Sequence, residues 1–99
     1  MLKFFRIKGT ELRKVALVDE EGNRTKVALI GLVEELIEKE VLEPAFGMNE
    51  RAWVCIPMQD VNNGKNNIGD NTVLLKLVEH DTLEEAKDFA RELAQKMYS

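Results

Sequence analysis

The chain has 99 residues and a formal net charge of −4, and 44% of its residues are hydrophobic and 32% charged. These values indicate one globular domain over residues 1–99 and exclude a disordered chain. No apolar run approaches the roughly 20 residues of a membrane-spanning helix. The lone cysteine, Cys55, excludes an internal disulfide and a multi-cysteine zinc site. Met1 to Arg6 does not form the apolar stretch of a signal peptide, so we expect a cytoplasmic protein without membrane contact.

The charge is distributed unevenly along the chain. The first 14 residues hold five basic residues and one acidic residue, a net charge of +4, which leaves −8 for the remainder. The basic residues are Lys3, Arg6, Lys8, Arg13 and Lys14. The acidic overall balance argues against generic nucleic-acid binding, whereas the basic N-terminal segment is compatible with a local nucleic-acid site.

Two strands are predicted at the N-terminus. Residues 2–8 combine Phe4, Phe5 and Ile7 with interspersed basic residues, which favours a strand, and residues 12–18 are largely apolar. Turn-forming residues follow each segment, beginning with Gly9 after the first strand and with the acidic, Gly-containing run 19–23 after the second.

The next segment allows two assignments. Residues 26–42 carry apolar side chains at helical spacing and Thr25 can serve as the N-cap, so we predict a helix from about residue 25. Pro44 disfavours helix at the residue before it, which ends the helix near that point. Alternatively, residues 27–30 form a third strand of a hairpin, and the helix begins only at Gly31.

The second half of the chain predicts strand, loop, strand and helix. Strands are expected over residues 51–58 and 72–79, with an Asn- and Gly-rich loop over 59–71 between them. Thr82 and Glu85 have the spacing of a capping box, which starts the last helix. The apolar face of that helix consists of Leu83, Ala86, Phe89, Ala90, Leu93, Ala94 and Met97.

The order of these elements is ββαββα. It indicates an α+β fold, a two-layer sandwich with a mainly antiparallel sheet and two helices on one face. The strands do not alternate cleanly, because residues 15–18 and 53–56 are apolar in succession. We therefore expect a homodimer through the apolar sheet face, or another protein partner there. The alternative is that loops or a third strand over residues 27–30 cover this face.

The loop over residues 59–71 is a candidate site for a partner or a ligand. Its candidate residues are Asp60, Asn62, Asn63, Gly64, Lys65, Asn66 and Asp70. The spacing departs from a calcium loop, since Gly64 falls one place early and no Glu occupies the twelfth position. It also matches no phosphate-binding fingerprint. We therefore expect no metal and no cofactor, and interpret the loop as a partner-contacting tip.

Few catalytic combinations are available. The only serine is Ser99, and Cys55 and His80 are the only cysteine and histidine. Cys55 lies in an apolar strand, where cysteine usually behaves as a small buried hydrophobe. The carboxylates over residues 34–43 have the spacing of a solvated helix face. We predict no catalytic residues.

Three functional hypotheses follow, in decreasing order of support. The first is a small non-catalytic interaction protein that acts as a homo-oligomer. The second is a nucleic-acid-binding module, in which Phe4 and Phe5 stack bases and Lys3, Arg6, Lys8, Arg13 and Lys14 hold phosphates. The third is an enzyme of unidentified class.

Overall fold

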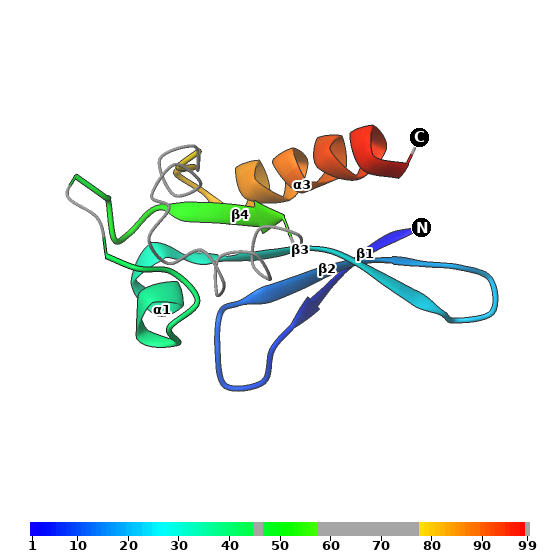
Figure 1. Ribbon diagram of the computed structural model, residues 1–99, viewed down its shortest axis with the longest axis horizontal. Coiled ribbons are helices and arrows are strands. Elements are labelled where there is room, and N and C mark those ends of the chain that lie inside the picture. Colours follow the sequence, from blue (N-terminus) through cyan, green and yellow to red (C-terminus); the bar gives the residue numbers. More distant parts are fainter. Residues whose placement is uncertain (45–46, 58–77, 99) are drawn as a thin grey trace.

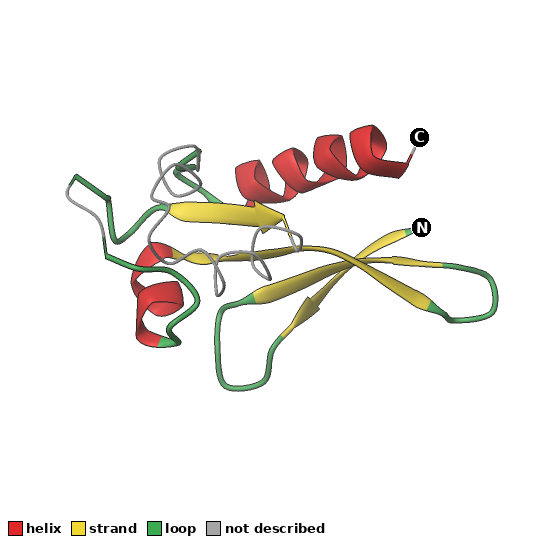
Figure 2. Cartoon of the chain, viewed as in Figure 1, coloured by secondary structure: helices red, strands yellow, loops and turns green. Residues whose placement is uncertain are grey.

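A computed structural model describes residues 1–44, 47–57 and 78–98. Within them the fold is α+β, with an antiparallel sheet and two helices (Figures 1 and 2). The strands are β1 (Leu2–Arg6), β2 (Arg13–Val18), β3 (Arg24–Leu32) and β4 (Trp53–Pro57), and the helices are α1 (Val33–Glu38) and α3 (Leu83–Tyr98). Neither of these helices has the length and apolarity needed to span a membrane.

The sheet has the order β1-β2-β3-β4, so each strand pairs with its neighbour in the chain. The predicted turns connect the first three strands. Thr10 stabilises the first turn, since its hydroxyl donates to the carbonyl of Ile7 at 2.8 Å and accepts the N–H of Leu12 at 3.1 Å. In the second turn the carboxylate of Asp19 accepts the N–H groups of Glu21 and Asn23, each at 2.9 Å.

A β-bulge interrupts the pairing of β2 with β3. Val15 lies opposite Ala28 and Ala16 opposite Lys26, which leaves Val27 without an opposing residue. Successive side chains of a strand point to opposite faces, so one extra residue reverses the alternation beyond it. Lys26 is therefore on the same sheet face as Ala16, although the unbroken alternation from the other end of β3 would give that face to Val27.

The helix predicted from about residue 25 is wrong, and the alternative of a third strand is correct. Residues 24–32 form β3, and α1 occupies only residues 33–38. β3 lies between β2 and β4, and residues 27–30 are buried, with exposed fractions of 8% or less. A strand buried on both faces has a continuous apolar run, and such a run also fits helical spacing. α1 is followed by Glu40, whose φ of 61° ends the helical conformation.

The two helices pack against opposite faces of the sheet. In β4, Cys55 belongs to the cluster that packs against α3, whereas Val54 and Ile56 belong to the cluster that contains α1 residues Val33 and Leu36. Adjacent strand residues point in opposite directions, so these clusters occupy different faces. The α3 cluster includes buried Ala86, Ala90 and Ala94.

This arrangement corrects the predicted layering. The prediction of two helices on one face is wrong, and the element order begins βββα rather than ββα. The predicted strand over residues 72–79 lies almost entirely outside the described residues. In the described part that follows, the backbone of His80 pairs with that of Trp53 through two hydrogen bonds of 2.8 Å.

The predicted start of the last helix is confirmed. The N–H of Glu85 donates to the hydroxyl of Thr82 at 3.2 Å, and that hydroxyl lies 3.2 Å from the Glu85 carboxylate. These contacts satisfy one of the N–H groups that a helix N-terminus leaves without a partner.

Candidate functional site

A cavity of about 310 Å³ lies on the sheet face opposite α3, over β1, β2 and β3. Its apolar lining includes Phe5, Ile7, Leu12, Ala16, Leu29 and Val41. Among the described residues, its charged lining consists of Lys14, Arg24 and Lys26 and includes no acidic residue. We call this side of the three strands the cavity face. Its volume is at the lower end of the range of small-molecule sites.

The strand register explains how the basic side chains gather there. Lys14 lies between Phe5 and Leu29, and Ala16 lies between Lys3 and Lys26. Directly paired residues share a sheet face, so Lys3 adjoins the cavity in the row next to Lys14. Lys3, Lys14, Arg24 and Lys26 are exposed. The cavity face therefore combines four cations with an apolar floor.

Arg24 and Phe5 form the closest aromatic contact of this face. The guanidinium carbon of Arg24 lies 4.2 Å from the centroid of the Phe5 ring, which is the geometry of a cation–π pair. Phe5 comes from the edge strand β1 and Arg24 from the start of β3, with β2 between them. The long arginine side chain thus crosses β2 at the cavity.

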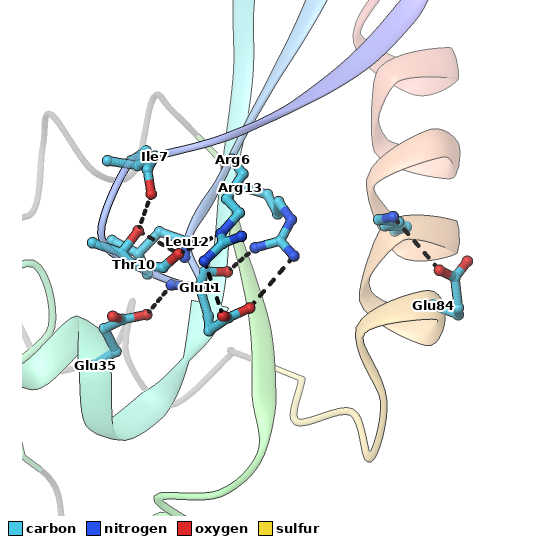
Figure 3. A network of polar contacts seen from close by, with 9 residues as sticks. Arg6, Ile7, Thr10, Glu11, Leu12, Arg13, Glu35 and Glu84 are labelled. Carbon is cyan, nitrogen blue, oxygen red and sulfur yellow. Dashed lines mark hydrogen bonds and ion pairs between the residues drawn. The ribbon is translucent and has the colours of Figure 1, made fainter.

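The structure separates the basic residues that the sequence groups together. Arg6 and Arg13 lie opposite each other on β1 and β2 and both form ion pairs with Glu11, at 3.4 and 3.5 Å (Figure 3). Arg6 also donates to the carbonyl of Thr10 at 2.9 Å. Lys8 lies in the turn after β1. Of the five predicted residues, Lys3 and Lys14 are on the cavity face.

Phe4 and Phe5 are likewise separated. Phe4 packs with the α3 cluster, and its ring centroid lies 5.4 Å from Lys87 Nζ and 5.2 Å from the Arg91 guanidinium carbon. Only Phe5 faces the cavity. Both phenylalanines contact cations, but from opposite sides of β1.

Sequence reasoning missed Arg24 and Lys26. The prediction of a helix from about residue 25 placed them at a helix start, away from any sheet face. The signal that could have found them was the alternative assignment of residues 27–30 to a strand. Even that assignment would have needed the bulge at Val27 to place both basic residues on the face of Lys14.

A second, acidic depression lies beside α1. It has a volume of about 390 Å³ and is lined by Glu11, Leu32, Glu34, Glu35 and Glu38. Two of its carboxylates have partners within the protein: Glu35 accepts the N–H of Glu11 at 2.9 Å, and Glu11 binds two arginines (Figure 3). In the described part of the chain, no group of three or more His, Cys, Asp or Glu residues could hold a metal ion.

Cys55 and His80 lack the environment of a catalytic pair. Burial raises the pKa of the Cys55 thiol to about 12, so the thiol is protonated and weakly nucleophilic at neutral pH. The ring of His80 lies 5.3 Å from that of Phe89, and its buried Nε2 has no hydrogen-bond partner among the described residues. Neither side chain lines the cavity.

The candidate loop over residues 59–71, with its proposed contacts from Asp60 to Asp70, lies outside the described residues. The candidate site therefore rests on the cavity face. No protein-family model, curated protein or solved structure matches the chain.

Proposed function

We propose that the protein is a non-catalytic binding module that holds an anionic ligand on its cavity face. The observation that carries this proposal is a concave apolar surface lined by Lys14, Arg24 and Lys26 and, in the described part of the chain, by no acidic side chain. Cations next to a low-dielectric apolar surface attract an anion more strongly than the same cations dispersed in water. The lining supplies cations and apolar groups, which bind and orient a ligand.

For an anion bound in the cavity, the nearby charges matter more than the net charge of the chain. The chain carries −4 overall, but a bound anion experiences mainly the charges within about a Debye length, roughly 8 Å at physiological salt. Glu11 and Glu40 are the acidic residues adjacent in sequence to the cavity lining, and Glu11 is paired with Arg6 and Arg13. A basic site on an acidic protein is therefore physically consistent.

The first test is retention on a heparin column at increasing salt concentration. We expect Lys14→Glu to elute at lower salt than the unchanged protein, because it reverses a charge at the centre of the cavity. Lys96→Glu is the matched control, since it makes the same charge change on the exposed surface of α3. Equal elution of Lys14→Glu and Lys96→Glu would overturn the proposed function.

The homodimer through an apolar sheet face stays a prediction. The apolar side chains of β2, β3 and β4 are mostly buried in the two clusters of the monomer. In residues 1–44, 47–57 and 78–98, the large hydrophobic residues with high exposure are Met1 at 83% and Val78 at 51%. A dimer would therefore need apolar surface in addition to these two residues.

A further inference from the structure

We infer that the ligand of the cavity face is a single-stranded nucleic acid, with a base over the Arg24–Phe5 pair and neighbouring phosphates on Lys3 and Lys14. This inference rests on the proposed function and names the chemistry of its ligand. It differs from the sequence prediction in its residues, because Arg6 and Arg13 are engaged by Glu11 and Arg24 takes part instead.

The lining of the cavity selects among anions. A simple inorganic anion would leave the apolar floor around Phe5 and Leu29 without a partner. An acidic peptide supplies carboxylates but no flat apolar group at regular intervals. A nucleic-acid strand supplies both repeated negative charges and aromatic base faces, and proteins bind it by combining cations with stacking platforms.

The Arg24–Phe5 pair is a preformed stacking platform. The guanidinium carbon of Arg24 lies over the Phe5 ring, 4.2 Å from its centroid, and Arg24 is exposed. A guanidinium plane stacks on a base as an aromatic ring does, and Phe5 holds this plane in position. Lysine has the charge of arginine but no such plane.

The distances between the cations suit a nucleic-acid strand with several phosphates. Residues of the same face are about 7 Å apart along a strand, and β1 and β3 are separated by about 10 Å across β2. Lys3 on β1 and Lys14 on β2 can therefore meet neighbouring phosphates, while a base lies over Arg24 at the start of β3. The bases of a duplex are stacked inside it, and a sheet face with a small cavity cannot reach their planes. The arrangement therefore favours a single-stranded nucleic acid over a duplex.

Fluorescence anisotropy with labelled oligonucleotides of about 12 nucleotides tests the inference. We expect oligo(dT) and oligo(U) to bind more tightly than a duplex of equal length and than inorganic polyphosphate of equal charge. Between about 50 and 200 mM salt, contacts of Lys3 and Lys14 to two phosphates predict a slope of log K against log salt of about −1.4.

Two variants isolate stacking from charge. Arg24→Lys keeps the charge and removes the guanidinium plane, and Phe5→Leu keeps an apolar side chain and removes the ring. Each should weaken oligonucleotide binding roughly 5-fold or more and leave polyphosphate binding nearly unchanged. Phe4→Leu is the matched control, since it makes the same change on the opposite face of β1. Thermal unfolding of each variant identifies any loss of fold, and an unfolded Phe5→Leu is replaced by Phe5→Met.

The outcomes separate the inference from the proposed function. If Lys14→Glu weakens heparin and polyphosphate binding, but oligonucleotides bind no better than polyphosphate or are unaffected by Arg24→Lys, the nucleic-acid inference is wrong and the proposed function stands. If the unchanged protein binds none of these polyanions at low salt, both are wrong. The same holds if Lys14→Glu binds every polyanion as Lys96→Glu does, because the ligand would then lie elsewhere on the molecule.

Discussion

Cys55 shows at the residue scale how burial sets reactivity. Burial raises the pKa of its thiol from the ordinary value of 9.0 to about 12, because the apolar surroundings disfavour the thiolate. We therefore expect the native protein to react with an aromatic disulfide reagent at about pH 8 at least 100-fold more slowly than the unfolded chain. Absorbance of the released thiolate measures the rate. Reaction of the native protein as fast as in guanidinium chloride would contradict the buried position.

The same pKa difference links the stability of the protein to alkaline pH. The unfolded thiol loses its proton near pH 9.0, whereas the folded thiol keeps its proton up to about pH 12. The folded state therefore binds more protons than the unfolded state in this window. As a result, the contribution of the Cys55 thiol to the free energy of unfolding falls as pH rises from 9 towards 12. Cys55→Ala removes this pH dependence and serves as the reference in the reactivity experiment as well.

At the scale of elements, Gly31 controls how closely β3 approaches its neighbours. A Cβ at this position would lie 2.3 Å from Leu12 Cδ2 and 3.2 Å from Leu36 Cγ. Gly31→Ala should therefore lower the free energy of unfolding by about 1–3 kcal/mol through overpacking. Urea denaturation measures this loss.

A double-mutant cycle identifies the cause of that loss. In a Leu12→Ala background the penalty of Gly31→Ala should shrink, because the closest atom is gone. Gly22→Ala is the control, because its added Cβ meets nothing within 4 Å and its φ of +87° strains an alanine. Its penalty should therefore be the same with Leu or Ala at position 12. An unchanged Gly31→Ala penalty in the Leu12→Ala background would exclude crowding as the cause.

The elements differ in how far the sequence predicts them, for physical reasons. The start of α3 was predictable because Thr82 and Glu85 act locally, within one turn of helix. β3 was assigned wrongly because the apolar run over residues 27–30 fits both a buried strand and a helix face, and only its tertiary neighbours decide between them. Of the candidate site, Lys3 and Lys14 were predicted and Arg24 was not, since its face depends on the bulge.

At the scale of the whole molecule, β3 connects every described layer. It pairs with β2 and β4 and also contacts both helices. We therefore expect the slowest amide hydrogen exchange at residues 27–30 and faster exchange in β1, which within the described sheet pairs only with β2. Exchange followed by mass spectrometry or NMR measures this order. Greater protection in β1 than in β3 would contradict the central position of β3.

The bulge at Val27 decides which side chains of β3 lie on the cavity face. The same Arg24 and Lys26 in an uninterrupted strand would exchange places with their neighbours and would leave the face of Lys14 to Thr25 and Val27. Pairing of Val27 with Ala16 would thus erase the basic patch without altering any basic residue. Proteins related to this one would have to be compared by strand phase, because aligned arginines and lysines would not guarantee a shared ligand.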